Sequence, residues 1–336
     1  MATKRRGQAL VSHPSPRLFS ALKFFKLAGM KGSDVVVFEG EQARFEGPIC
    51  MISLGVESHN LDGHAVNGLQ LLSAIEDARG ELLFTIDGPS MHVRHDALEI
   101  SLPVTSHCAK FDFPAMPTSI TLGDLLPLAE MAKMVPDAVL SVQNKKLTLF
   151  SPFCMAERYL SEDIKREVTI SYDLIVKLSS TPNALGWSVA VGDAWRLALL
   201  GAGPNGPLVV TGGPRAPCED VEIGGFPAYN QFAPILPEFF LALKRAKKLS
   251  SSKMVTAIPF VGFQVEVNTA LALIPCSEVG AIEGEFEFSV LEALKFVAEQ
   301  VAMTNRRGLP IVYWFHKANK SRGVVAGLAH GTIDDA

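Results

Sequence analysis

One pattern recurs along this chain of 336 residues and constrains its fold more than any single motif. A short amphipathic helical segment is followed by two or three segments with the character of strands, and the same order then begins again. The predicted helices start about 50 to 65 residues apart, so about six units of roughly 56 residues fill the chain. One helix and several strands in each unit exclude an all-helical solenoid and indicate six similar mixed units.

The predicted helices carry apolar residues at intervals of three and four. In the fifth helix, Phe239, Leu243 and Ala246 belong to such a stripe, while Lys244 and Lys248 lie off it. We predict helices over residues 16–25, 66–75, 236–249 and 290–301, and two more that begin near residues 122 and 172.

The segments between these helices alternate apolar and polar residues, as strands do when one face of a sheet is buried. Met91 and Val93, for example, alternate with His92 and Arg94. Strands are predicted over residues 35–38, 42–45, 49–54, 82–86, 91–94 and 98–102. The predicted fold class is therefore α+β, with helices packed on one side of antiparallel sheets.

Composition narrows the class of protein further. Hydrophobic residues make up 48% of the chain and charged residues 20%, which is typical of a soluble globular protein and excludes disorder for most of its length. The formal net charge of −4 excludes a uniformly basic surface but not a local one. No apolar run is long enough to cross a membrane.

The five cysteines are odd in number and far apart, which favours reduced thiols in a cytosolic protein over a disulfide framework or a zinc site.

Two groups of short motifs stand at unit boundaries. The first is Met91-His-Val-Arg94, followed by Ile100-Ser-Leu102 and Phe111-Asp-Phe-Pro114. The second is Gly225-Phe-Pro-Ala-Tyr229, followed by Pro234. Together with the six units, their order resembles the bacterial-type sliding clamp, the β subunit of the replicative DNA polymerase. In that family the first group ends the first domain and the second links the second domain to the third.

The resemblance implies the DNA-clamp fold: three similar domains of two units each, over residues 1–117, 118–225 and 226–336, with two identical chains closing into a ring. It implies double-stranded DNA as a partner bound without sequence preference. It also implies that the replicative DNA polymerase and the clamp loader bind through a short peptide motif. No catalytic residue, metal or cofactor is expected. The expected location is the cytoplasm, at the nucleoid, or the host cytoplasm if a phage encodes the protein.

Two departures from the family pattern indicate a divergent member, such as a phage- or plasmid-encoded copy. The family's T-D-G-H-R-L turn in the third unit has no identical counterpart near Ser151–Met155. Where the family has paired arginines after F-P-x-Y, this chain has Asn230 and Gln231.

A clamp that slides must attract phosphates weakly and without reading bases, which lysines and arginines on the helices around its hole can do. Such residues lie on or beside the predicted helices, most densely in the first, fifth and sixth units. The alternative that they only form solvated helix faces stays open. The candidate DNA-binding residues are Lys23, Lys26, Lys31, Arg79, Lys133, Lys177, Lys244, Arg245, Lys248 and Lys295.

A short partner peptide with hydrophobic anchors needs a preformed apolar groove on the clamp. In the family this groove lies between the second and third domains, near the C-terminal strand. Ordinary interdomain core is the alternative interpretation of the same residues. The resemblance assigns to the groove Pro152, Phe153, Met155, Pro227, Phe232, Val324, Val325 and Leu328.

Other functions were weighed against the clamp. A small-molecule enzyme of unfamiliar α+β fold would use the loop with His59 and His64, or Cys108, although the spacing matches no defined metal or catalytic site. A clamp-like scaffold that recruits partners without encircling DNA is the third hypothesis. Residues 201–206 fit G-x-G-x-x-G, but a strand-like segment follows them where a dinucleotide site needs a helix, so they predict a hairpin turn.

Overall fold

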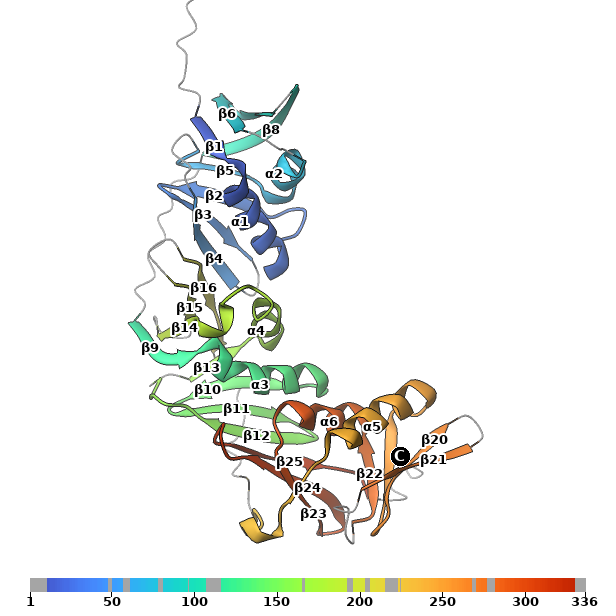
Figure 1. Ribbon diagram of the computed structural model, residues 1–336. Helices are drawn as coiled ribbons and strands as arrows, with labels where there is room; N and C mark the ends of the chain where they lie inside the picture. The colour runs from blue at the N-terminus through green and yellow to red at the C-terminus, as the bar shows by residue number, and fades with distance from the viewer. Residues whose placement is uncertain are drawn as a thin grey trace, which may run out of the picture. The chain divides into compact units, whose positions relative to one another are not determined.

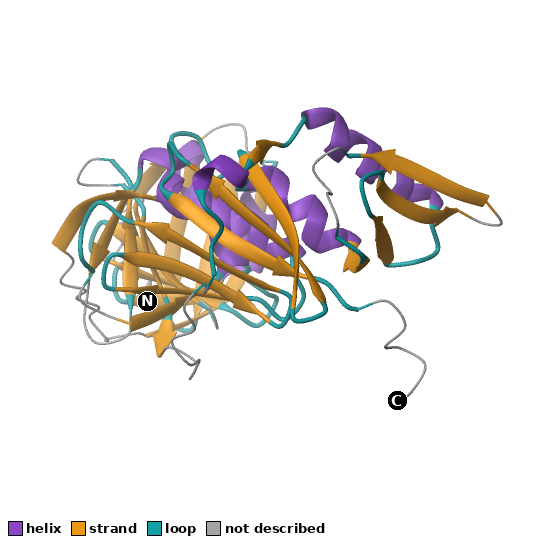
Figure 2. Cartoon of the chain, turned by 90° about the horizontal axis from the view of Figure 1, so that it is seen from below, coloured by secondary structure: helices purple, strands orange, loops and turns teal. Residues whose placement is uncertain are grey.

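The computed structural model is strand-rich, with six α-helices among the residues it describes (Figures 1 and 2). The chain divides into two compact units. The α+β class predicted from the sequence is confirmed. The described residues are 11–47, 50–56, 61–77, 81–95, 97–106, 116–164, 167–191, 196–202, 206–214, 223, 225–267, 270–276 and 282–329.

The predicted repeat is present, because each helix is followed by three to five strands. The second helix begins two residues later than predicted, since Val66 pairs with Val36 and Val104 in a strand. The sixth helix ends early: a 3-10 turn follows at Leu294–Phe296, and Val301 pairs with Trp314 in a strand. The helices are α1 (Ser15–Ala28), α2 (Gly68–Ile75), α3 (Leu122–Met134), α4 (Tyr172–Leu178), α5 (Pro237–Leu249) and α6 (Phe288–Ala293).

The first unit comprises residues 1–122 and 177–212 and contains one twelve-stranded antiparallel sheet. Its core includes Leu22 and Phe25 of α1, and the Phe25 ring lies 5.8 Å from that of Phe45 in the sheet. The strands, in spatial order, are β1 (Val11–Pro14), β6 (Glu81–Asp87), β7 (Ser90–His95), β8 (Leu98–Ser106), β5 (His64–Asn67), β2 (Val35–Glu39), β3 (Gln42–Glu46), β4 (Cys50–Gly55), β16 (Leu208–Thr211), β15 (Leu197–Leu200), β14 (Ser188–Val191) and β9 (Met116–Thr121).

The second unit comprises residues 123–176 and 213–336 and contains two antiparallel sheets. The nine-stranded sheet has the order β17 (Gly213–Pro214), β13 (Glu167–Ile170), β10 (Val139–Gln143), β11 (Lys146–Ser151), β12 (Cys154–Tyr159), β25 (Ser321–Ala326), β24 (Leu309–His316), β23 (Gln300–Arg306) and β18 (Ala233–Pro234). The four-stranded sheet has the order β21 (Ala270–Pro275), β20 (Gly262–Val267), β19 (Met254–Ile258) and β22 (Gly284–Glu287).

The nine-stranded sheet presents two different faces, because alternate residues of a strand point to opposite sides. On what we call the helix face, the Arg158 guanidinium of β12 lies 2.6 Å from the Asp124 carboxylate in the first turn of α3. Figure 1 shows α3 running alongside β10 and β11. On what we call the linker face, the segment 226–232 packs its aromatic rings against Tyr313 and Phe315 of β24.

Three cysteines fall within the described residues, namely Cys50, Cys154 and Cys276, and all three are buried. Burial raises the pKa of Cys50 to about 11, with a smaller opposing effect from Lys177, so the group stays protonated at neutral pH. No disulfide joins these three cysteines to one another, which is compatible with the predicted reduced state, while Cys108 and Cys218 lie outside the described residues. No helix in the described part of the chain is long and apolar enough to span a membrane.

Candidate partner groove and nucleic-acid interface

The predicted groove residues of β12 and β25 meet on the linker face. These two strands pair antiparallel, and Met155 stands directly opposite Val324. Both side chains are half-buried, as is that of Phe153 at the turn before β12, while Pro152 is exposed. The Ser151 hydroxyl holds this turn by accepting hydrogen bonds from the backbone N–H groups of Phe153, at 3.2 Å, and Cys154, at 3.0 Å.

The linker contributes the other aromatic residues of this face. Phe232 stacks on Phe226 with ring centroids 5.2 Å apart and meets Phe315 edge-on at 4.8 Å. Tyr229 also meets Phe315 edge-on, at 5.2 Å, and is 72% exposed. Pro227 follows Phe226 in the same segment, and its side chain is half-buried. The predicted residue Phe232 therefore lies on the same sheet face as Met155 and Val324, and Pro227 belongs to the same linker segment.

Two other predicted groove residues, Val325 and Leu328, do not lie beside Met155 and Val324 on the linker face. Val325 points to the helix face, where its side chain is fully buried, so a ligand on the linker face would meet Val324 and not Val325. Leu328 lies beyond the end of β25, where its backbone exchanges hydrogen bonds of 2.8 and 2.9 Å with Glu285. The sequence could not separate Val324 from Val325, because both are apolar and alternation is absent there.

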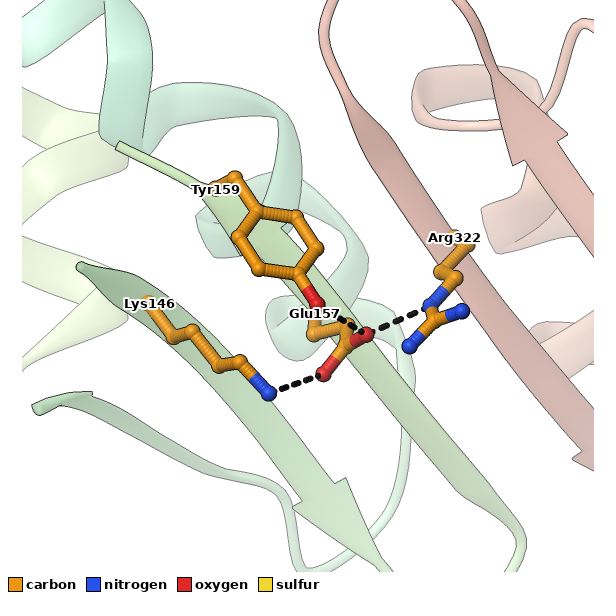
Figure 3. Close-up of polar contacts among 4 residues, drawn as sticks. All are labelled: Lys146, Glu157, Tyr159 and Arg322. Atoms are coloured by element: carbon orange, nitrogen blue, oxygen red, sulfur yellow. Dashed lines mark hydrogen bonds and ion pairs between the residues drawn. The ribbon is translucent and has the colours of Figure 1, made fainter. Parts of the chain in front are cut away.

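A buried carboxylate that sequence reasoning missed lies between these strands. The side chain of Glu157 is 7% exposed, and its Oε2 lies 3.1 Å from the Lys146 ammonium. Its Oε1 accepts hydrogen bonds from Arg322 Nε at 2.5 Å and from the Tyr159 hydroxyl at 3.4 Å. Figure 3 shows the three partners converging on the carboxylate from β11, β12 and β25. We call these four residues the Glu157 cluster.

The Glu157 cluster is held in its charged state. Burial by itself would raise the pKa of Glu157, but the hydrogen bonds and positive charges of Arg322 and Lys146 outweigh burial and lower it. Burial also opposes the charge of both cations, yet their contacts with Glu157 raise the pKa of Lys146 and of Arg322. The cluster therefore ties β11, β12 and β25 together electrostatically at neutral pH.

A cavity of about 670 Å³ opens beside the Glu157 cluster, entirely within the second unit. Tyr159, Tyr229 and Phe315 form its aromatic part, and Lys317 and Lys320 lie at the turn between β24 and β25. The remaining lining residues are Glu299, Gln300, His316, Ser321 and Arg322. We call this cavity the lysine pocket. Sequence analysis missed it, although two lysines in one short turn were a visible signal.

The cations predicted on the fifth helix share one exposed face. Lys244, Arg245 and Lys248 of α5 are exposed at intervals of three and four, opposite the buried Phe239 and Leu243. This arrangement places three positive charges side by side on a helix surface, which suits phosphate attraction without base readout.

The other predicted cations differ in their exposure and in whether an acidic side chain already pairs with them. Lys23 and Lys26 of α1 are exposed, and the Lys23 ammonium lies 4.1 Å from the Phe19 ring centroid. The Lys295 ammonium lies 3.0 Å from the Glu292 carboxylate, and Lys247 lies 3.2 Å from the same carboxylate. The charge of Lys295 is therefore already engaged within the fold. Arg79 lies outside the described residues. Exposed side chains are also found at Lys31, Lys133 and Lys177.

The alternative sites are only partly within the described residues. There, no group of three or more histidine, cysteine and acidic side chains could hold a metal ion. His64 Nδ1 lies 2.9 Å from the backbone oxygen of Asp62, and its proposed partner His59 is not among the described residues. Leu200 pairs antiparallel with Leu208, which confirms that the glycine-rich segment joins two strands of a hairpin.

Comparison with known proteins identifies the fold. No family model matches the sequence, and no curated protein resembles it in sequence. Solved structures do match, and they are DNA sliding clamps. The DNA polymerase III subunit beta of Pseudomonas aeruginosa matches with a TM-score of 0.67 and 14% identity, over 95% of this chain and 99% of that one.

Two further structures agree with this result. The Helicobacter pylori beta clamp, solved with a DNA ligase peptide, matches with a TM-score of 0.68 at 10% identity, over 96% of this chain and 100% of that one. A putative DNA polymerase III beta subunit from Eubacterium rectale matches with a TM-score of 0.69 at 9% identity, over 95% of this chain and 100% of that one. The chain therefore has the DNA-clamp fold, as the resemblance implied.

The Glu157 cluster generates a prediction about stability and pH. A carboxylate whose pKa is lowered by folding stabilises the protein above its unfolded pKa of about 4.3, and this contribution is lost as the pH falls toward the folded pKa. Glu157→Gln should reduce the free energy of unfolding at pH 7 by roughly 1–2 kcal/mol, because it removes the negative charge that binds Lys146 and Arg322. The loss stays this small because both cations are partly exposed to water. Urea denaturation of the variant and of the unchanged protein, at pH 7 and near pH 3.5, measures this free energy of unfolding.

The difference between Glu157→Gln and the unchanged protein should shrink at the lower pH. Glu266→Gln, which alters an exposed residue of β20, serves as the control and should cost little at either pH. An equal loss of stability at both pH values would contradict the charged state of Glu157.

Proposed function

We propose that this protein is a DNA sliding clamp, a polymerase processivity factor that encircles duplex DNA and tethers the replicative polymerase and other partners. The observation that carries the proposal is the match of nearly the whole chain to β-subunit structures along their whole length. Exposed cations on the helices and an aromatic-lined sheet face support it independently. In this role the chain acts by binding, without catalysis, in the cytoplasm.

The proposed assembly is a homodimeric ring in which each chain supplies three domains, over residues 1–117, 118–225 and 226–336. Two strand edges favour it. Strand β21 ends the four-stranded sheet and exposes Leu271 and Leu273, at 67% and 50%. Residues 98–103 of β8 pair only with β7 among the described strands. Unpaired edges are templates for another chain, so β21 of one copy would pair with β8 of the next.

The assembly is tested by light scattering coupled to size exclusion, together with negative-stain images. We expect a dimer at micromolar concentration and a two-fold ring with a central hole. Leu273→Lys should shift the protein toward monomer, because it places a charge on the pairing edge. Leu309→Lys, which alters an exposed residue at the start of β24, should not. A strict monomer would contradict the ring, and a dimer that is not retained on circular DNA after loading would point to a scaffold.

DNA binding by the ring would rest on charge alone. Lysines and arginines on a helix surface neutralise phosphates and release counterions, which gives affinity without sequence preference. The α5 face of Lys244, Arg245 and Lys248 is the densest such surface among the described helices. Concentrating cations there is compatible with the net charge of −4, provided that the rest of the surface is acidic.

The double variant Lys244→Ala/Arg245→Ala should weaken binding of a short fluorescent duplex about equally for unrelated sequences. The slope of log affinity against log salt should fall by about one unit for each lost phosphate contact. Lys145→Ala, an exposed lysine in the turn between β10 and β11, is the matched control and should leave the slope unchanged. Fluorescence anisotropy over a salt series measures both, and an unchanged slope in the double variant would remove α5 from the DNA surface.

The peptide groove is assigned to the linker face around Met155, Val324 and Phe232. An apolar peptide anchor needs a site walled by apolar and aromatic side chains, and these residues offer such side chains on one face of a rigid sheet. The DNA ligase peptide on the Helicobacter pylori clamp is a precedent in a structural relative. Val324 replaces Val325 as the expected β25 contact, because only Val324 faces this side.

Phe232→Asp should lower the affinity for a fluorescent peptide with a Leu-Phe anchor by at least about tenfold, since it puts a charge into the apolar site. The dimer should persist. Phe260→Asp is the matched control, because Phe260 is 76% exposed on the β19–β20 turn, away from the linker. Equal peptide affinities in the two variants would contradict the groove.

A further inference from the structure

The lysine pocket is lined by three cationic side chains, Lys317, Lys320 and Arg322, and by one acidic side chain, Glu299. Lys317 and Lys320 are exposed, and among the described residues neither ammonium has an ion-pair partner. Arg322 is already engaged by Glu157, and the carboxylate of Glu299 accepts the backbone N–H of Lys317 at 3.1 Å. The two lysine charges therefore remain available to a ligand in a chain whose net charge is −4.

The turn that carries these lysines is fixed rather than loose. The Lys320 N–H donates to the Lys317 carbonyl at 3.2 Å, and the Lys320 carbonyl accepts from the Tyr159 N–H at 3.2 Å. Glu299 holds the start of the same turn through Lys317. Both ammonium groups thus project from a defined backbone beside the aromatic rings of Tyr159, Tyr229 and Phe315.

The chemistry of the pocket favours an acidic ligand with an extended backbone. Its volume of about 670 Å³ lies in the usual range of ligand pockets, roughly 300–1,000 Å³. Its aromatic walls can cover aliphatic or backbone atoms, while the ammonium groups bind carboxylates. Arg322 also lines the pocket, but its charge is already engaged by Glu157. Its guanidinium lies 5.5 Å from the centroid of the Phe226 ring.

The pocket and the proposed groove lie along the same face of β12 and β25. Tyr159 of the pocket and Met155 of the groove are four residues apart on the same face of β12, which corresponds to about 13 Å. Arg322 and Val324 are two residues apart on the same face of β25. An extended peptide of about four residues can span this distance. Glu157 stands between Met155 and Tyr159 on β12, and its contacts with Lys146 and Arg322 hold the three strands at this spacing.

We infer that the lysine pocket is a second subsite for the partner peptide, which recognises an acidic side chain about four residues from the hydrophobic anchor. This inference rests on the proposed peptide groove. It predicts that the partners of this chain carry one or two Asp or Glu residues at that spacing. The pocket then selects partners by charge, while the groove supplies the apolar anchor.

The test uses fluorescein-labelled peptides of about ten residues and the full-length protein. Two of them carry a Glu-Glu pair and a Leu-Phe anchor separated by Gly-Ser-Gly, in the two possible orders. Two others replace Glu-Glu by Gln-Gln. The expected result is that one acidic peptide binds about fivefold more tightly than its Gln-Gln counterpart, with a preference that fades as salt is raised.

The double variant Lys317→Gln/Lys320→Gln should abolish that preference and leave the affinity for the Gln-Gln peptides unchanged. Lys253→Gln, an exposed lysine just before β19, should keep the preference. Binding of all four peptides without an acidic preference, or a preference that survives in the double variant, would overturn the inference while the groove stands. Failure of every peptide to bind would overturn the groove and the inference together.

Single-stranded DNA is the competing ligand, because phosphates and bases also suit lysines and aromatic rings. A fluorescent oligothymidine of about ten nucleotides should bind the unchanged protein and the double variant equally weakly. If it bound only the unchanged protein, and the acidic peptides showed no preference, the pocket would be assigned to nucleic acid and the inference would be wrong.

Discussion

The pairing of β12 with β25 is the interaction on which the second unit depends. Residues 154–158 and 321–325 are far apart in the sequence, yet their backbones form one continuous register. This pairing joins the third helix-and-strand group to the sixth within a single nine-stranded sheet. The Glu157 carboxylate reinforces it from β12 by binding Arg322 of β25 and Lys146 of β11. A partly buried ion cluster of this kind costs desolvation, so its main physical effect is to fix the register.

The same pairing separates two surfaces with different chemistry. On the helix face, Val325 and Trp314 are fully buried and Arg158 meets Asp124 of α3. On the linker face, the rings of residues 226–232 leave Met155 and Val324 half-buried next to a cationic pocket. Rigid β structure thus positions both proposed peptide subsites, while the helices carry the proposed DNA contacts. The two partners are thereby assigned to different secondary-structure elements of the chain.

Charge is unevenly distributed among the residues that the structure describes. The free cations of α5 are neighbours on one helix face, whereas Lys247 and Lys295 are paired with Glu292. Counting lysines and arginines along the sequence treats all of these alike. Only the three-dimensional arrangement distinguishes a charge that can attract phosphate from one that already stabilises the fold. The proposed DNA surface therefore depends more on α5 than on Lys295.

The sequence by itself determined the six-fold repeat, the α+β class and most helix starts, because periodicity of apolar residues is a local property. The resemblance to the clamp family also assigned Met155 and Phe232 to a common region. Tertiary structure alone decided that Val324 faces the linker and Val325 the helices, since two adjacent valines give no alternation to read. It likewise assembled Glu157 with Lys146 and Arg322, because the strands that meet there are up to 165 residues apart in sequence and only sheet pairing brings them together.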